Sequence, residues 1–257
     1  SQFNFIGLAN YKFMFTKDQL FWTALKNTLV FVLMGVPAYR IVAITLSILL
    51  NNAIKGMRFF RTIYYLPSVM SGVAVYLLWM QLFSPGSGLI NTVLGWFGIQ
   101  GPAWLYDPFW TKPALVIMGL WGAGGNMLLY LARLKGIPQQ LYESAEIDGA
   151  NVFQKFFKIT LPMLTPIIFF DLVTGMIGAF QVFQSAYVMT GGTSDGPMNP
   201  MNSLLFYNYY LWNKAFKTFD MGYATAMSWF LFAIIMGATL INLKLSNRWV
   251  YYEGADL

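Results

Sequence analysis

The sequence predicts an all-α integral membrane protein, and two observations indicate this class. Hydrophobic residues make up 57% of the 257 positions and charged residues only 10%, whereas soluble domains carry about 25% charged residues. A soluble fold of this length could not bury so much apolar surface. The apolar residues also gather into long segments, and a helix that crosses a bilayer needs about 20 of them in succession.

Five segments meet this length, and we expect each to be a membrane-spanning helix of a single membrane domain over residues 1–257. They cover residues 22–50, 62–83, 113–134, 161–189 and 221–243. Pro37 and Arg40 interrupt the first segment, so we expect it to tilt or kink. The stretch 88–99 is too short to span a bilayer and is expected to form an interfacial or re-entrant helix.

Composition excludes several kinds of site. The chain has no cysteine and no histidine, so it lacks disulfides, thiolate metal ligands and the commonest general base near neutral pH. No metal site and no catalytic residues are therefore expected. The net charge of +6 is compatible with nucleic-acid binding, but in a membrane protein basic residues more often mark cytoplasmic loops. We expect a lipid bilayer, and no nucleic acid, around this chain.

Lys and Arg are densest beside one end of the expected spans, which the positive-inside rule assigns to the cytoplasm. On that side lie Lys55, Arg58, Arg61, Arg133, Lys135, Lys155, Lys158, Lys244 and Arg248. This orientation makes residues 135–160 a cytoplasmic loop and places the first residues outside. The chain begins without methionine and shows no signal peptide, so we expect one more span on the N-terminal side of this sequence.

The polar stretch 141–166 stands between two very apolar segments. Glu143 and Glu146 are three residues apart and share a helix face, and Gly149 ends the short helix and permits a sharp turn. Pro162 suits the first turn of the next helix, where its missing N–H is not needed. The stretch therefore predicts a short surface helix, a turn and a rigid return into the membrane. Taken without its motif spacing, the stretch is more typical of a solvated loop between spans.

The spacing of this stretch closely resembles the signature loop of ATP-binding-cassette (ABC) importer permeases. In that signature Glu-Ala-Ala is followed by three residues and Gly, then by nine residues, Ile, one residue and Leu-Pro. Here it runs Glu143-Ser144-Ala145, Gly149, Ile159 and Leu161-Pro162. Ser144 replaces the middle alanine, which exchanges one small residue for another. Other stretches, among them "FFRTIYYLPSVMSGVAVYLLWMQLFSPGSGLIN" and "FQVFQSAYVMTGGTSDGP", resemble the carbohydrate branch, the maltose/glycerol-phosphate-type permeases.

The resemblance implies the polytopic helical bundle of the type I ABC importer permeases, in a bacterial cytoplasmic (inner) membrane. It implies a saccharide importer that works with two ATPase subunits, a second permease of related but different sequence, and an extracytoplasmic solute-binding protein. In the family this loop is a coupling helix that docks on the ATPase. Carried over to this chain, the docking element would be Glu143, Ser144, Ala145, Asp148 and Gly149, and Leu161 and Pro162 would join it to the moving helix.

Hydrolysis of ATP is not expected in this chain, because the sequence contains no G-x-x-x-x-G-K-[ST] phosphate loop. The glycine-rich stretches "GAGGNM" and "GGTSDGP" lack the required lysine. We therefore expect no cofactor here, with ATP and Mg²⁺ bound by partner ATPase subunits. Differential binding of the permease conformations to the ATP and ADP states of that partner would then drive transport.

Polar and aromatic residues at membrane depth are candidates for the substrate path. Amides and flat rings with few charges suit a neutral, polyhydroxylated ligand. The candidates are Trp121, Asn126, Tyr130, Gln181, Gln184 and Tyr187. Small and amide residues also serve hydrogen bonding between helices, and Tyr187 is equally a candidate for an outer gate.

Arg40 and Asp171 are the two charges placed well inside expected spans. Structural pairing of the two is the favoured interpretation. The alternatives are that Asp171 faces a partner permease, or that Arg40 contacts an acidic sugar, which would make uronate oligosaccharides a substrate. Two other transporter classes stay open: an ABC permease for a non-sugar solute, and an ion-coupled secondary transporter. The latter often shows repeated halves and several membrane carboxylates, neither of which is evident here.

Overall fold

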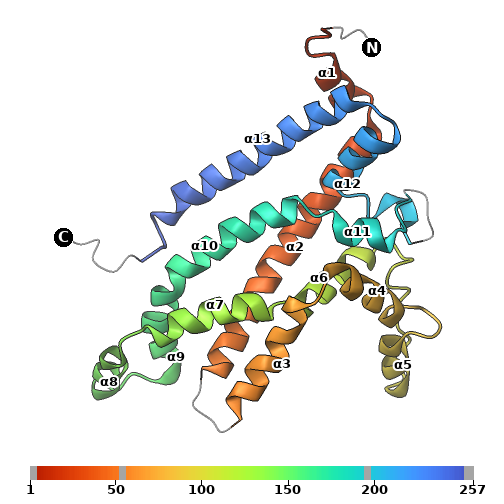
Figure 1. Ribbon diagram of the computed structural model, residues 1–257. Helices are drawn as coiled ribbons and strands as arrows, with labels where there is room; N and C mark the ends of the chain where they lie inside the picture. The colour runs from red at the N-terminus through yellow and green to blue at the C-terminus, as the bar shows by residue number, and fades with distance from the viewer. Residues whose placement is uncertain (1–4, 52–55, 194–197, 252–257) are drawn as a thin grey trace. The chain divides into compact units, whose positions relative to one another are not determined.

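The computed structural model describes residues 5–51, 56–193 and 198–251. Within these ranges every regular element is a helix (Figure 1), which confirms the all-α prediction. The orientation argument included Lys55, which lies outside the described residues. The helices are α1 (Ala9–Thr16), α2 (Gln19–Leu50), α3 (Met57–Val69), α4 (Gly72–Leu82), α5 (Leu89–Trp96), α6 (Thr111–Trp121), α7 (Gly124–Lys135), α8 (Gln139–Ile147), α9 (Val152–Lys155), η1 (Phe156–Thr160), α10 (Leu161–Phe180), α11 (Gln184–Met189), η2 (Pro200–Asn202), α12 (Tyr207–Trp212), η3 (Asn213–Lys217) and α13 (Met221–Ser246).

Three helical stretches of the described chain are long and apolar enough to cross a membrane. They cover Gln19–Leu50, Val152–Met189 and Met221–Ser246. Two further bent pairs, α3 with α4 and α6 with α7, raise the number to as many as five if each pair is one span. The five-span prediction therefore depends on reading each bent pair as a single crossing.

The predicted continuous helix over 62–83 is wrong, because α3 ends at Val69 and α4 begins at Gly72. Pro67 lies in the last turn of α3, and without an N–H it cannot donate to the carbonyl of Ile63. Ser71 then takes an extended ψ of 129° and its carbonyl accepts from Val75 as the new helix starts. The apolar composition continues through this break, so hydropathy alone does not reveal it.

The predicted helix over 113–134 is broken in the same way, between α6 and α7. Four glycines surround the break, at positions 119, 122, 124 and 125, and glycine weakens a helix interior by about 1 kcal/mol relative to alanine. Two of them permit close packing. A Cβ at Gly124 would overlap the main chain of Tyr64 on α3, and one at Gly119 would overlap the ring of Tyr39 on α2.

The chain divides into two compact units, each of which takes segments from all along the sequence. The first contains residues 1–35, 70–118 and 177–237, and the second contains 36–69, 119–176 and 238–257. The core of the first unit is rich in fully buried rings, among them Phe21, Phe206, Tyr207 and Tyr209. Its α4 packs on α11.

The second unit has an aliphatic core. Leu134, Ile137, Met163 and Leu164 are buried together, and side chains from α2 and α8 pack against them. The helices α3 and α7 of this unit also pack on one another, at the place where Gly124 lets their backbones approach. This core packs beneath both parts of the candidate site, the α8–α9 hairpin and the polar cluster around Asp171, which are described below.

Candidate functional site

The signature loop folds as a helical hairpin in the second unit, in which α8 leads through a turn to α9 (Figure 1). Gly149 adopts a φ of +74°, the left-handed conformation that glycine tolerates best. The N–H of Gly149 bonds to the carbonyl of Glu146, and the N–H of Ala150 bonds to that of Ala145. This pair of bonds is a Schellman ending, so the predicted role of Gly149 in ending the helix has a definite geometry.

The second arm of the hairpin begins with its own cap. The Asn151 side chain accepts from the N–H of Gln154, and the Gln154 side chain accepts from the N–H of Asn151. A reciprocal pair of this kind satisfies two N–H groups that a helix start leaves free. The turn between α8 and α9 is therefore fixed at both ends by local hydrogen bonds.

Pro162 lies in the first turn of α10, as predicted, but this helix does not follow a loop. Helical structure is already continuous from Val152, and Pro162 follows a π-helical turn, η1, in which the N–H of Leu161 bonds to the carbonyl of Phe156. Pro162 has no N–H for the carbonyl of Lys158, and widened turns of this kind often accommodate a missing bond in a helix. Leu161 and Pro162 are both half-buried, so they join the hairpin to α10 without an intervening loop.

Two contacts bind the arms of the hairpin together. The hydroxyl groups of Tyr142 and Thr160 lie 2.9 Å apart, and the Lys155 ammonium is 2.7 Å from a Glu146 carboxylate oxygen. Tyr142 also packs against the aliphatic core around Leu134. Because Glu146 is exposed, we expect its ion pair to contribute less to stability than the part-buried contact of Tyr142 with Thr160.

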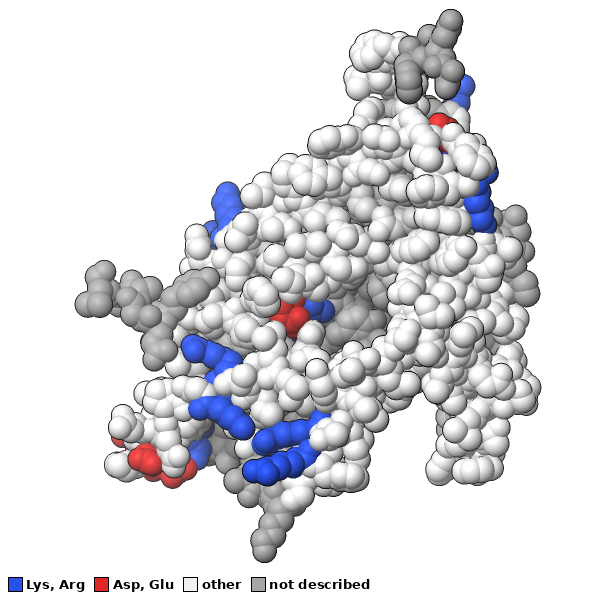
Figure 2. Space-filling model, viewed as in Figure 1, with Lys and Arg blue, Asp and Glu red and all other residues white. Residues whose placement is uncertain are grey.

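The outer surface of this hairpin is exposed and mixed in chemistry. Figure 2 shows acidic atoms gathered over α8, with basic atoms beside them, and Glu143, Ser144, Glu146 and Asp148 are all exposed. Sequence reasoning missed the apolar side chains of this surface, which are Leu141, Ile147, Val152, Phe153 and Phe157, 42–87% exposed. Exposed apolar side chains with charged neighbours are typical of surfaces that bind a protein partner. The hairpin offers no catalytic constellation.

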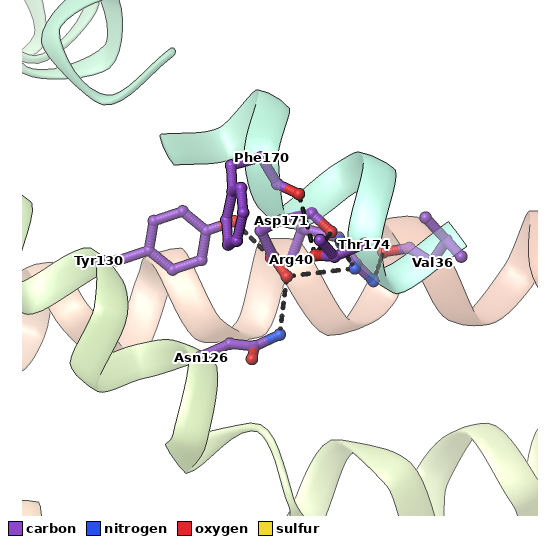
Figure 3. Close-up of polar contacts among 7 residues, drawn as sticks. All are labelled: Val36, Arg40, Asn126, Tyr130, Phe170, Asp171 and Thr174. Carbon is purple, nitrogen blue, oxygen red and sulfur yellow. Dashed lines mark hydrogen bonds and ion pairs between the residues drawn. The ribbon is translucent and has the colours of Figure 1, made fainter. Parts of the chain in front are cut away.

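The second part of the site is a buried polar cluster around Asp171 on α10 (Figure 3). Asp171 is 4% exposed. Its Oδ1 accepts from Arg40 at 3.2 Å and from Asn126 at 3.0 Å, and its Oδ2 accepts from the Tyr130 hydroxyl at 2.6 Å. Of the alternatives open for Arg40 and Asp171, the structure shows the pairing of the two with each other.

Arg40 is also held by main-chain oxygens. Its guanidinium donates to the carbonyl of Val36 at 3.0 Å and to that of Asp171 at 2.6 Å. A Cβ at Gly175 would overlap the guanidinium, so the glycine makes room for arginine against the backbone of α10. With side chains only 8% and 5% exposed, this pair is a structural tie between α2 and α10 rather than an open ligand site.

The six substrate-path candidates do not form one group. Asn126 and Tyr130 belong to the cluster around Asp171, and Tyr130 is fully buried. Trp121, which ends α6, belongs to the same unit and is 38% exposed. Gln181, Gln184 and Tyr187 belong to the first unit. The predicted span 161–189 lies within the helical stretch Val152–Met189, but α10 ends at Phe180 and α11 begins at Gln184, so these three do not share a continuous face.

Tyr187 is part of an aromatic group in the first unit. Its ring stacks on Phe183 at 5.3 Å and meets the edges of Trp212 at 4.9 Å and Tyr209 at 6.0 Å. Gln184 is exposed at the start of α11, beside Gly72 of α4. An exposed amide next to rings retains the chemistry that a sugar needs. Among the described residues, no group of three or more His, Cys, Asp or Glu side chains could hold a metal ion.

Comparison with known proteins gives consistent matches along nearly the whole chain. The family model described as "Binding-protein-dependent transport system inner membrane component" matches residues 21–250. A probable ABC transporter permease protein, YesP of Bacillus subtilis, is 45% identical over 253 residues, which are 98% of this chain and 80% of that protein. The lactose transport system permease protein LacF of Rhizobium radiobacter is 38% identical over 232 residues, which are 88% of this chain and 76% of that protein.

A solved structure is similar as well. A chain in the crystal structure of a bacterial alginate ABC transporter, in complex with an alginate pentasaccharide-bound periplasmic protein, has a TM-score of 0.82 and 28% identity. The match covers 95% of this chain and 83% of that one. The similarity therefore extends to the arrangement of the helices along most of both chains.

Proposed function

Because the chain belongs to the family of binding-protein-dependent transport system inner membrane components, we propose that it is a permease subunit of an ATP-driven importer of saccharides. The resemblance seen in the signature loop is confirmed by this membership. The chain is a multi-pass membrane protein and a transport component rather than an enzyme. The bacterial cytoplasmic membrane is its proposed location.

The observation that carries the proposal is the exposed hairpin of α8 and α9. It offers a partner both acidic and apolar side chains, while Gly149 and Asn151 fix its turn. Its second arm runs without a loop into α10. We propose that an ATPase subunit docks here, through Glu143, Ser144, Ala145, Asp148 and Gly149. A displacement of the hairpin would then reach α10 through Leu161 and Pro162.

The proposed assembly has two permeases, two ATPase subunits and an extracytoplasmic solute-binding protein. ATP and Mg²⁺ would bind to the ATPase subunits, because this sequence has no phosphate loop. Support for a binding protein comes from the similar solved structure, which is a complex with a periplasmic protein. The second permease is proposed to be a related but different chain.

The proposed substrate is an oligosaccharide. Relatives that are at least 32% identical are named for lactose, arabinooligosaccharides and trehalose/maltose transport. An acidic oligosaccharide is the finer proposal, supported by two similar solved structures of alginate transporters. Arg40 is a poor candidate for binding that acid, since it is paired with Asp171 and buried. The exposed Gln184 and its aromatic neighbour Tyr187 are better candidates for contact with sugar.

The experiment is coupled transport by the complex purified from native membranes and reconstituted in vesicles with its binding protein. Gly149→Val forces a β-branched residue into the left-handed region, which costs about 1–2 kcal/mol or more. We expect this variant to lose ATP-driven saccharide uptake, either because the ATPase detaches or because hydrolysis no longer depends on substrate.

Gly98→Val is a matched control. Gly98 has a φ of +73° and ends α5 with the same pair of bonds, from Gly98 to Gly95 and from Ile99 to Leu94. The local strain is therefore the same, but Gly98 belongs to the first unit and the hairpin to the second. We expect Gly98→Val to keep coupled uptake. Normal coupled uptake by Gly149→Val would refute the docking role.

A further inference from the structure

A hollow of about 490 Å³ in the first unit plays no part in the proposed function. Its lining includes Lys26 and Val30 of α2, Lys112 of α6, and Ser203 after η2. Phe109, which is 76% exposed, stands at its edge. No acidic residue lines the hollow, so its charge is wholly positive.

The two lysines of the hollow are not neutralised by the chain around them. Neither forms an ion pair with any residue that the structure describes. The positive charge of Lys26 acts unfavourably on that of Lys112. Two ammonium groups that repel one another and line the same hollow would both be stabilised by one anion between them.

Ser203 adds a hydrogen-bond donor to the same hollow. It is 4% exposed, and its hydroxyl has no partner within the described chain. The loop that carries it is held on α2, because the Asn27 amide donates to the carbonyls of Asn202 at 2.7 Å and Leu205 at 3.0 Å. A buried hydroxyl without a partner is uncommon in native structures, and here it lines a hollow that already favours an anion.

Depth in the membrane identifies the kind of anion. From residue 27 to its end at Leu50, α2 is about 36 Å long at 1.5 Å per residue, enough to cross the hydrocarbon core of about 30 Å. A span over these residues would put Lys26 at the level of the lipid headgroups, and Lys112 is in the first turn of α6. Val30 and Met34 continue the wall of the hollow from Lys26 toward the core of the bilayer.

We propose that this hollow binds one anionic phospholipid, with its headgroup phosphate between Lys26 and Lys112 and an acyl chain along Val30 and Met34. The charge count of the loops places this headgroup in the outer leaflet. The carboxylate of a free oligosaccharide could pair with the lysines, but a sugar would not pack on the apolar side chains below them. A phospholipid can do both, so we propose a lipid. The proposal does not depend on the identity of the transported solute.

The test uses the intact transporter in detergent, with phosphatidylglycerol or phosphatidylcholine added. Native mass spectrometry counts the bound lipid, and the thermal midpoint reports its effect. A lysine near the membrane surface strengthens binding to an anionic lipid about fivefold, so we expect the Lys26→Gln/Lys112→Gln double variant to bind phosphatidylglycerol about thirtyfold more weakly. Phosphatidylcholine binding should not change.

Two further variants are controls. Lys17→Gln removes an exposed lysine that does not line the hollow and should bind phosphatidylglycerol as the parent does. Lys26→Arg/Lys112→Arg keeps the charge and should restore binding. Equal binding of both lipids by the parent, or an equal loss in Lys17→Gln, would overturn the proposal. Displacement of the lipid by an acidic oligosaccharide would also overturn it, because the lysines would then serve the solute.

Discussion

Two buried aspartates, Asp171 and Asp18, are stabilised in different ways in the two units of this chain. Asp171 is 4% exposed and Asp18 is 7% exposed, so both carboxylates have lost most of their water. Asp171 lies within the long helix α10 and is paired with Arg40. Asp18 lies just before α2 and forms no ion pair with a described residue.

The carboxylate of Asp18 accepts hydrogen bonds from an N–H group at the start of a helix and from two tyrosine hydroxyl groups. Its Oδ1 accepts from the N–H of Phe21 in the first turn of α2 at 3.1 Å. Its Oδ2 accepts from the hydroxyls of Tyr210 at 2.7 Å and Tyr223 at 2.5 Å. Burial, and then the hydrogen bond to Asp18, raise the pKa of Tyr210, so its hydroxyl remains a donor. The positive end of the helix dipole adds to this stabilisation.

The comparison shows that position within a helix decides what a buried acid requires. In the interior of α10 the backbone N–H groups are already bonded within the helix, so Asp171 depends on side chains from α2 and α7. At a helix start the N–H groups are free, so Asp18 needs no cation. Asp171 therefore ties α10 to α2 and α7 with the help of an ion pair, whereas Asp18 ties the start of α2 to α12 and α13 through neutral donors.

The largest effect is expected from Asp171→Asn. The substitution leaves the Arg40 guanidinium buried with no counter-charge, which costs about 3–5 kcal/mol. We expect much less intact complex to be recovered from membranes and a lower thermal midpoint, with the substrate preference of the surviving complex unchanged. The double variant Arg40→Met/Asp171→Asn removes both charges and should recover most of the loss. Equal amounts of intact complex with an altered substrate profile would show instead that Asp171 serves the solute.

An intermediate effect is expected from Gly175→Ala. The new methyl group overlaps the Arg40 guanidinium, so the arginine must leave its position against α10, and overpacking of this kind costs about 1–3 kcal/mol. Gly178→Ala is the matched control, one turn further along the same helix, where a Cβ meets nothing within 4 Å. We expect the thermal midpoint to fall only in Gly175→Ala. Equal midpoints for the two variants would mean that Arg40 is not tightly held.

The sequence predicted one of the two aspartates and could not predict the other. Asp171 was recognisable because a charge within an apolar helix is costly and needs a partner. Asp18 stands in a polar stretch, and its tyrosines are 192 and 205 residues away along the chain, so nothing local marks them as partners.

The same limit applies to the rest of the fold and of the site. The turn at Gly149 followed from local backbone chemistry and could be predicted. The helix breaks near Ser71 and Val182 were not predicted, because apolar residues dominate both stretches, although Pro67 and Gln181 lie beside the breaks. The assignment of Asn126 and Tyr130 to the Asp171 cluster depended on which helices pack together, and a single sequence does not contain that information.

The smallest effect is expected from Asp18→Asn, the same chemical change made in the other unit. The asparagine oxygen still accepts from Phe21 or from the tyrosine hydroxyls, and asparagine caps a helix about as well as aspartate. No cation is left unpaired, because the structure gives Asp18 none among its described residues. We expect a loss of stability of about 1 kcal/mol, roughly the strengthening that a charge gives to hydrogen bonds of this kind.

The thermal midpoint of Asp18→Asn, compared with that of Asp171→Asn in the same complex, measures the difference directly. A loss as large as that of Asp171→Asn would mean that Asp18 has a counter-charge in the assembled transporter, and that the two aspartates are stabilised alike.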